Sequence, residues 1–494
     1  MTGDWWREGV LYQIYPRPFA DSNGDGVGDL QGITERLEHL AWLGADGIWL
    51  SPVTPSPNAD WGYDVADYCA VDPAFGTVAD LDALVDAAGR RGIHVILDLV
   101  PNHTSIEHPW FVDARSSRDA DHRDWYVWAD PKPDGSPPNN WVSGFGGPMW
   151  TFDATTGQSY MHSHLPEQPD LNWWNEGVRA AFDDILRFWL DRGVAGFRID
   201  VAQILVKDRE LRDNPPATDD DDWYARVLGQ KPVYNLCRPE VHDVYRHWRV
   251  ITDGYEPPGL LLGETWVHDV ETLATFYGRD DELNLALNFP FVFAKFDADS
   301  LSAVVEATER ALPSEAWPVW AAGNHDVSRF PTRWAKGEAA RARVALLMLL
   351  TLRGTPILYY GDEIGMTDVP VGAGDARDFL GRDPERSAMQ WEDVDRQRAD
   401  PASMLNLARD LVALRRESED LRNGEYRTLV VDGGLWAWRR GDGAVVALNL
   451  GPEPATHDAV AGTIAICTNR SRDGETVNGT LTLAPDEALV LFGR

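Results

Sequence analysis

The strongest constraint on the fold is a unit that repeats along the chain. Each unit is a short run of β-branched and aromatic residues, then a polar cluster, then a segment with helical periodicity. The runs begin at Val10, Gly47, His94, Gly196, Leu260, Leu283, Pro318 and Pro356. Amphipathic stretches such as residues 30–44 and 178–193 separate them. Eight strands alternating with helices predict an α/β fold, a parallel (β/α)8 TIM barrel.

Three segments depart from the simple repeat. Residues 104–171, after the third strand, are rich in Trp, Pro, Gly and Asp and are too long for a simple loop, so we expect an inserted subdomain over the barrel mouth. Residues 203–249 predict a long lid after the fourth strand. In residues 425–494 strand-like runs alternate with turn signals. This pattern predicts a C-terminal all-β domain, a β-sandwich. The barrel would then comprise residues 1–103 and 172–424.

Charge and composition exclude several classes of partner. The chain carries 79 acidic and 45 basic residues, a formal net charge of −34, which argues against nucleic acid or an anionic membrane. The N-terminus lacks the pattern of a signal peptide, and the longest apolar run, residues 344–352, is too short to span a bilayer. Three widely spaced cysteines argue against a disulfide framework or a zinc site. We expect a cytoplasmic protein, a monomer or a homodimer.

Polar residues that close the apolar strands are the candidates for catalysis, because active sites in this fold lie at the carboxyl ends of the strands. A carboxylate at a strand end can also simply cap the next helix. Several acids, two histidines and an arginine at such positions favour an active site instead. These candidates are Asp98, His103, Arg198, Asp200, Glu264, His325 and Asp326.

The run GFRIDVA places two opposite charges two positions apart. Arg198 and Asp200 therefore point to the same face of the strand. A neighbouring guanidinium lowers the pKa of a carboxyl, so we expect Asp200 to be ionised and suited to be a nucleophile. Glu264 has apolar neighbours, and burial there would raise its pKa and keep a proton available. Such a pair provides the nucleophile and the acid of glycoside hydrolysis.

Four segments, LDLVPNH, GFRIDVA, LLLGETW and AAGNHD, resemble the signature regions of the α-amylase family, glycoside hydrolase family 13. The resemblance covers essentially the whole chain. It implies a catalytic triad of nucleophile, general acid/base and transition-state stabilising acid, which here are Asp200, Glu264 and Asp326. It also implies that His103 and His325 bind sugar hydroxyls, with Arg198 fixing the nucleophile and Asp98 supporting that arginine.

Further motifs, WGYD, QPDLNW and GRDPERSAMQW, resemble the exo-acting α-glucosidases, including the oligo-1,6-glucosidases. In that branch Asp60 and Arg382 would close the pocket around the non-reducing end, Tyr63 would stack on the sugar, and Phe145 would line it. The resemblance implies a retaining exo-α-glucosidase that acts on short α-1,4 or α-1,6 glucosides. Val201, after the nucleophile, tends to accompany α-1,6 activity, but maltose-, isomaltose- and sucrose-type bonds all stay open.

The early loop DSNGDGVGD offers oxygen ligands at alternate positions, which suit a hard cation. It resembles the first part of an EF-hand loop, with Gly32 where that loop has its bidentate glutamate. Related glucosidases carry calcium in a matching loop, so we expect a structural Ca²⁺. The ligands would be Asp21, Asn23, Asp25, Asp29 and the carbonyl of Val27.

Three alternative functions remain open. A transglucosidase, a sucrose-active enzyme or a glucoside isomerase of the same family would share every catalytic residue. A catalytically inactive relative that serves as a binding partner would be expected to lose the acids, which this chain keeps. A barrel enzyme with a catalytic metal would have to explain Arg198 beside the supposed ligands. A retaining mechanism requires the two carboxyls to lie roughly 5 to 5.5 Å apart.

Overall fold

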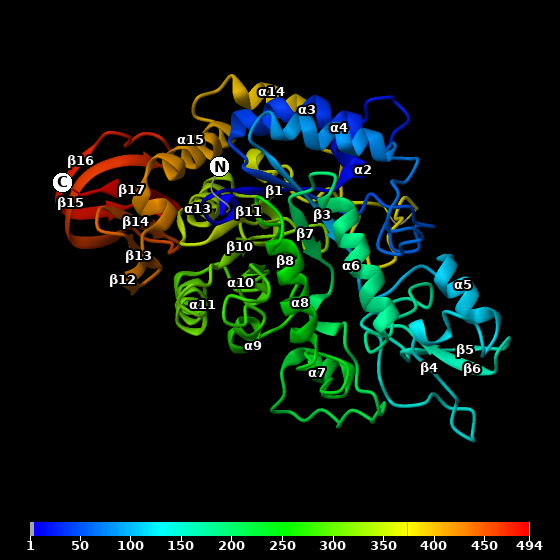
Figure 1. Cartoon of the computed structure of the whole chain (residues 1–494). Helices are drawn as coiled ribbons and strands as arrows, with labels where there is room; N and C mark the ends of the chain where they lie inside the picture. Colours follow the sequence, from blue (N-terminus) through cyan, green and yellow to red (C-terminus); the bar gives the residue numbers. More distant parts are fainter. Residues whose placement is uncertain (1–3, 373, 494) are drawn as a thin grey trace.

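The computed structural model, which describes residues 4–372 and 374–493, is built around a sheet of eight parallel strands (Figure 1). The strands are β1 (Leu11–Ile14), β2 (Gly47–Leu50), β3 (His94–Leu99), β7 (Gly196–Ile199), β8 (Leu260–Gly263), β9 (Leu285–Ala286), β10 (Val319–Ala321) and β11 (Thr355–Tyr359). Their order, β10-β11-β1-β2-β3-β7-β8-β9, makes β9 and β10 the two ends of a nearly closed barrel. Each predicted run overlaps one of these strands, so the predicted barrel is confirmed.

Alternating side chains of the strands divide the core into two parts. Leu11, Trp49 and Ile96 belong to a cluster inside the barrel. Tyr12 and Ile48, one position away, belong to the larger cluster between the strands and the surrounding helices. Because both faces of a parallel barrel strand are buried, the sequences of the strands are nearly continuous apolar runs. A polar residue in such a run is therefore exceptional.

Helices follow the strands and cover the outside of the barrel. They are α3 (Leu30–Leu43), α4 (Val78–Gly89), α6 (Glu176–Leu190), α8 (Val241–Asp253), α9 (Val270–Thr275), α11 (Ala298–Ala311), α13 (Ala339–Thr351) and α15 (Met404–Glu417). Helix α3 shows how the sequence defines one of them. The side chain of Asp29 accepts the N–H of Gly32 to cap its start, and Gly44, at φ 92°, ends it.

Shorter helices lie in the connections. They are α1 (Trp5–Glu8), α2 (Pro16–Phe19), η2 (Ala202–Ile204), α10 (Phe289–Val292), α12 (Phe330–Arg333), η3 (Asp362–Ile364), α14 (Trp391–Arg398) and α16 (Glu419–Asn423). Helix α7 (Trp223–Leu228) lies in the long segment after β7, where we predicted a lid. No helix of the described residues is both long enough and apolar enough to cross a membrane.

The segment after β3 forms a small subdomain of its own. It contains α5 (Pro109–Ser116), η1 (Arg123–Trp125) and an antiparallel sheet of β4 (Trp128–Ala129), β6 (Gln158–Met161) and β5 (Trp150–Asp153). Isolated bridges, His103 to Asp170 and Tyr126 to Leu171, join its beginning to its end. Figure 1 shows this subdomain (cyan) and α7 (green) on the lower side of the molecule.

The C-terminal region is the antiparallel all-β domain that we predicted, and its strands form one hydrogen-bonded sheet. Its strands, in the order β12-β13-β14-β17-β15-β16, are β12 (Tyr426–Asp432), β13 (Leu435–Arg440), β14 (Ala444–Asn449), β17 (Glu487–Phe492), β15 (Ala455–Cys467) and β16 (Thr476–Leu483). Register shifts at Thr428/Val430 and Ile464/Ile466 bend the strands. One face packs Trp436 and Trp438 against the main core, and the other encloses a second cluster.

Candidate active site

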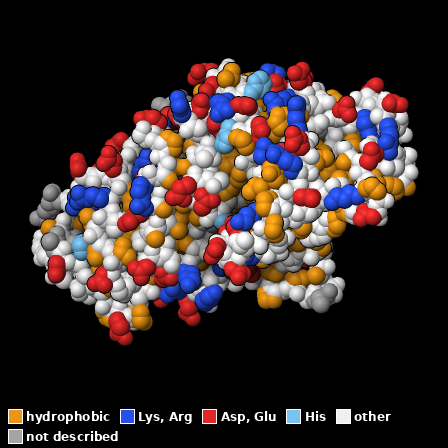
Figure 2. All heavy atoms as spheres, turned by 90° about the horizontal axis from the view of Figure 1, so that it is seen from below, with side chains coloured by type: hydrophobic (Ala, Val, Ile, Leu, Met, Phe, Trp, Pro, Cys, Tyr) orange, Lys and Arg blue, Asp and Glu red, His pale blue; other side chains and the backbone are white. Residues whose placement is uncertain are grey.

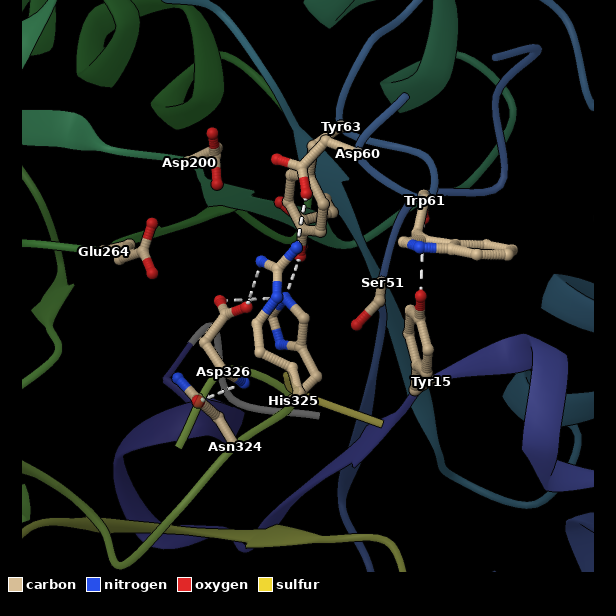
Figure 3. Close-up of polar contacts among 12 residues, drawn as sticks. Tyr15, Ser51, Asp60, Trp61, Tyr63, Asp200, Glu264, Asn324, His325 and Asp326 are labelled. Carbon is tan, nitrogen blue, oxygen red and sulfur yellow. Dashed lines mark hydrogen bonds and ion pairs between the residues drawn. The ribbon is translucent and has the colours of Figure 1, made fainter. Parts of the chain in front are cut away.

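A cavity of about 450 Å³ opens at the carboxyl ends of the barrel strands. Most of the predicted site residues line it, although they come from distant parts of the chain. These are Asp60, Tyr63, His103, Phe145, Asp200, Glu264, Asp326 and Arg382. Arg198 and His325 are fully buried and contact the lining residues from behind. In Figure 3 the carboxyl groups of Asp200, Glu264 and Asp326 lie around the same open space.

Arg198 holds the first group of carboxylates together. It lies opposite Asp98 in the register of β3 and β7, and its Nη1 lies 2.8 Å from Asp98 Oδ1 and 2.8 Å from Asp200 Oδ1. Its Nη2 lies 2.7 Å from Glu264 Oε1. Asp98 also accepts hydrogen bonds from Trp49 and Tyr63 and has no exposed side-chain surface. Asp98 thus orients the arginine and does not line the cavity, as the family resemblance implied.

This sharing corrects our prediction for Asp200. Burial and the charge of Glu264 raise the pKa of Asp200 well above its ordinary value, and Arg198 opposes that rise only in part. We had expected the guanidinium to pair with Asp200 and to be supported by Asp98, but it also contacts Glu264. When Glu264 takes up a proton, its repulsion disappears and Arg198 favours the ionised form of Asp200.

The backbone between these two carboxyls is strained. Val201 has φ 38° and ψ 49°, a left-handed conformation that is rare for a β-branched residue. Its N–H donates to Glu264 Oε2 at 3.0 Å, and the N–H of Ala202 donates to the backbone carbonyl of Glu264 at 2.9 Å. The turn after β7 is thereby tied to the end of β8. Such strain persists only where the surroundings over-determine it, and it is common in active sites.

Asp326 lies among cationic and polar groups. Its Oδ1 accepts from Arg382 Nη1 at 2.9 Å and from Arg386 Nη2 at 2.8 Å, and its Oδ2 lies 3.2 Å from His325 Nε2. Burial alone would raise the pKa of Asp326, but the guanidiniums of Arg382 and Arg386 outweigh it and hold that pKa well below its usual range. Asp326 is therefore ionised. We did not predict Arg386, although it stands in the same motif as Arg382.

A second ion pair closes the deep end of the cavity. Arg382 Nη2 contacts Asp60 Oδ1 at 2.5 Å, and its Nε donates to both carboxylate oxygens of Asp378, at 2.8 and 2.9 Å. Gln168 Nε2 donates to Asp60 Oδ2 at 3.2 Å. Burial raises the pKa of Asp60 to about 6 against the opposing effect of Arg382. Arg382 therefore joins Asp60 to Asp326 across the end of the pocket.

Two buried histidines are held neutral. His325 Nδ1 lies 2.8 Å from Gln13 Nε2, and its ring stacks on Tyr63, with centroids 5.2 Å apart. Burial lowers the pKa of His325 well below its usual value despite the neighbouring Asp326. Burial likewise lowers the pKa of His103 to about 4, and its Nε2 lies 3.1 Å from Gln168 Nε2. Neutral imidazoles in this position are suited to bind sugar hydroxyls.

Several residues near the cavity were not predicted from the sequence. The buried Lys207 pairs with Asp170 at 2.7 Å, behind His103. His164 lines the cavity beside His103, and its Nδ1 is buried without a partner. The helix α7 contributes Trp223 and other residues to the wall. Only the length of the segment after β7 signalled that it would reach the site.

The predicted metal loop shows a different arrangement of oxygens. Asp21 Oδ2 accepts the N–H of Gly26 at 2.8 Å, and Asn23 Oδ1 accepts the N–H of Asp25 at 2.8 Å. The side chains of Asp21, Asn23 and Asp25 are exposed. Asp21 accepts three backbone N–H groups, from Asn23, Gly24 and Gly26, and its carboxylate, with about four lone-pair sites, keeps one more. The three side chains fit a hard cation, together with the carbonyl of Val27.

Asp29, in contrast, uses both carboxylate oxygens in hydrogen bonds within the protein. Its Oδ1 accepts the N–H of Gly32 at 2.6 Å at the start of α3, and its Oδ2 accepts from the backbone and hydroxyl of Ser22. It is also buried, unlike the rest of the loop. Within the part of the chain that the structure describes, no group of three or more His, Cys, Asp or Glu is placed to hold a metal ion.

Comparison with known proteins agrees with this geometry. The sequence model of the protein family described as alpha amylase, catalytic domain, matches residues 13–424 of this chain. The chain belongs to the alpha-amylase family. It is therefore a glycoside hydrolase with the barrel of that family, which confirms the resemblance seen in the signature motifs.

Individual relatives cover almost the whole chain. A probable alpha-glucosidase of Rhizobium meliloti (strain 1021) is 40% identical over 502 residues, covering 92% of this chain and 91% of that protein. An oligo-1,6-glucosidase of Heyndrickxia coagulans is 36% identical over 501 residues, covering 87% and 88%. The crystal structure of an alpha-glucosyl transfer enzyme, XgtA, matches with a TM-score of 0.92 and 37% identity over 99% of both chains. The trehalulose synthase MutB of Pseudomonas mesoacidophila MX-45 matches with a TM-score of 0.90 and 28% identity over 99% of both.

Proposed function

We propose that this alpha-amylase family member is a retaining exo-α-glucosidase that releases α-glucose from the non-reducing end of short α-1,4 or α-1,6 glucosides. The observation that carries the proposal is the Arg382 bridge between Asp60 and Asp326. It closes one end of the cavity that also contains Asp200 and Glu264. A closed end admits one terminal sugar, whereas an endo-acting enzyme needs an open groove. The similarity to an oligo-1,6-glucosidase supports the same assignment.

The geometry supports a two-step double displacement. Asp200 attacks the anomeric carbon while Glu264 protonates the departing glycosidic oxygen, which breaks the glycosidic bond and forms a glucosyl ester. Glu264, now ionised, takes a proton from water, and that water cleaves the ester with the α configuration restored. Arg198 favours this cycle because it contacts both carboxylates and stabilises whichever of them is charged.

The experiment is a substrate panel with analysis of the released anomer. We expect maltose or isomaltose to yield glucose from the non-reducing end, with the α anomer first seen by NMR before mutarotation. Initial release of the β anomer would contradict retention. Random shortening of a long α-glucan in place of terminal glucose release would contradict the exo assignment.

A second candidate is glucosyl transfer or sucrose isomerisation with the same catalytic residues. The likeness to an alpha-glucosyl transfer enzyme and to a trehalulose synthase favours it, because the same covalent intermediate would then pass to an acceptor other than water. Incubation with sucrose alone and with added phosphate separates these reactions. Glucose plus fructose supports hydrolysis, an isomer of sucrose supports isomerisation, and glucose phosphate supports phosphorolysis.

We also propose that Ca²⁺ binds the loop of residues 21–27. The exposed oxygens of Asp21, Asn23 and Asp25, with the carbonyl of Val27, form the donor set. Asp29 contributes by capping α3 and so positions the end of the loop. The loop lies outside the cavity lining, so the ion would stabilise the fold and take no part in catalysis.

A further inference from the structure

Another cavity, of about 260 Å³, lies at the amino ends of the barrel strands, and we call it the amino-face cavity. Its lining includes Val10, Asp46 and His94, which stand at or just before the starts of β1, β2 and β3. Helices α1 and α15 add residues such as Trp5 and Arg415. The catalytic cavity opens at the other ends of the same strands, so the two cavities lie on opposite faces of the barrel.

The lining of the amino-face cavity is rich in charge. Figure 2 shows a different face, seen from below, the side on which α7 lies in Figure 1, where hydrophobic side chains border a hollow. Three acids and three arginines line the amino-face cavity instead, and they are Asp4, Glu8, Asp46, Arg415, Arg416 and Arg422. The two signs balance, so the lining favours a neutral polar ligand over an anion or a cation.

The acids are paired but keep the capacity to accept further hydrogen bonds. Asp46 Oδ1 accepts from Arg416 Nη2 at 2.7 Å. Glu8 Oε1 accepts from the side chain of Asn423 at 2.9 Å, and Glu8 Oε2 lies 3.5 Å from Arg422 Nη1. A carboxylate has about four lone-pair sites, so both acids can still accept the proton of a hydroxyl group.

The same cavity also has spare donors. Trp5 Nε1, Arg415 Nε and Arg422 Nε are buried without a hydrogen-bond partner among the described residues. Arg415 is only 1% exposed, and its terminal nitrogens donate to backbone carbonyls of residues 350–354. Leaving a buried N–H without a partner is destabilising, so a ligand oxygen that accepts from these groups would bind favourably.

His94 adds one group of each kind. Its ring stacks on Trp5, with centroids 4.1 Å apart and an interplanar angle of 12°. Burial lowers the pKa of His94 against the opposing effect of Asp46, so the imidazole is neutral at pH 7. A neutral imidazole has one donor and one acceptor nitrogen. Because a sugar hydroxyl both donates and accepts, it matches a wall that offers spare groups of both kinds.

The size of the amino-face cavity limits the ligand. Sites for drug-sized ligands typically span roughly 300–1,000 Å³, so a cavity of about 260 Å³ suits a single sugar ring.

We propose that the amino-face cavity binds one neutral monosaccharide, as a second sugar site remote from the catalytic cavity. Trp5 Nε1, Arg415 Nε and Arg422 Nε donate to its oxygens, while the carboxylates of Glu8 and Asp46 accept from its hydroxyls. The bound sugar joins α1 to α15 and stabilises the folded state in proportion to its occupancy. This inference does not depend on the proposed glucosidase activity.

The test is photoaffinity labelling of the full chain with a glucose derivative that carries a diazirine, followed by mass spectrometry of the peptides. We expect adducts on peptides that contain residues 4–10 or 412–422, and excess free glucose should prevent them. Adducts confined to peptides of the catalytic cavity, or no adducts at all, would overturn the inference.

Two variants and a matched control locate the site. Trp5→Phe removes one donor and keeps a ring against His94, whereas His94→Phe removes both ring nitrogens and keeps the stack. At a low concentration of the derivative, we expect each variant to raise the glucose concentration that halves labelling by about fivefold, the effect of a lost hydrogen bond. Trp317→Phe is the control, because Trp317 Nε1 is also buried without a partner among the described residues but does not line the cavity. An equal rise in the control, or no rise in the two variants, would contradict the site.

Charged analogues of glucose test the balance of the lining. Glucuronate and glucosamine should compete with the derivative no better than glucose, because each meets groups of its own sign. Competition by either analogue at less than a tenth of the required glucose concentration would overturn the assignment of a neutral ligand.

Discussion

The deep end and the mouth of the cavity are built in different ways. The deep end takes Asp200 and Glu264 from the ends of neighbouring parallel strands, and a buried arginine connects their charges. The mouth takes Trp223 from a short helix inside a long connection, and its contacts are apolar and half exposed. Rigid barrel strands thus hold the reacting groups, while the connections shape what is attached to the sugar. Chemistry and selectivity can therefore change independently.

The largest effect is expected at the deep end. Asp200→Ala removes the nucleophile, so we expect kcat to fall by at least about 10⁴-fold with the fold intact. Azide, which fits the vacated space, should restore turnover and give β-glucosyl azide, because it attacks from the face that Asp200 occupied. Product analysis by NMR checks this. An azide product of α configuration would remove Asp200 from the nucleophile role.

The next effect concerns the bridge that closes the pocket. Arg382→Met leaves Asp60, Asp326 and Asp378 without their shared cation, so we expect kcat/KM for terminal glucosides to fall about 10³-fold and the free energy of unfolding to fall by about 3 kcal/mol. Arg187→Met is a control, because Arg187 is 46% exposed and pairs only with Asp184 at 3.5 Å. Urea unfolding and initial rates measure both. Less than a threefold loss of kcat/KM would show that the bridge does not hold substrate.

A smaller effect appears in the pH dependence of stability. The folded state holds the pKa of Asp326 well below its ordinary value of about 3.9. Its contribution to stability is therefore present above that ordinary pKa and is lost as the pH falls below it. We expect Asp326→Asn to lower the free energy of unfolding by about 2 kcal/mol at pH 7, and the difference to shrink below about pH 4. A difference that grows as the pH falls would contradict the assigned charge.

The smallest effect is expected outside the cavity. Removal of Ca²⁺ by a chelator should lower Tm by about 2 °C and leave kcat unchanged, because the loop of residues 21–27 does not line the cavity. In Asp21→Asn the same chelator should produce a smaller shift. Scanning calorimetry with matched activity assays makes the measurement. An undiminished shift in the variant would place the ion elsewhere.

Much of the fold was predictable because barrel strands have local signatures. The β-branched runs and the face of α3 follow directly from side-chain periodicity. The C-terminal domain was only partly predictable, since turn signals located strands but not the bulges that curl them into one sheet. The alternation at Arg198 and Asp200 correctly placed both side chains on one face. It said nothing of the burial of Asp200 or of the nearby charge of Glu264, which together raise the pKa of Asp200 that we expected to be lowered.

By itself, the amino-acid sequence determined the barrel and its family and singled out the candidate carboxyls, because each depends on short motifs and on spacing along one strand. Tertiary structure alone decided how one guanidinium is divided among Asp98, Asp200 and Glu264. It also decided that α7 brings Trp223 to the cavity mouth. The physical reason is that charge interactions and apolar contacts act through space, between groups that the chain separates by tens of residues.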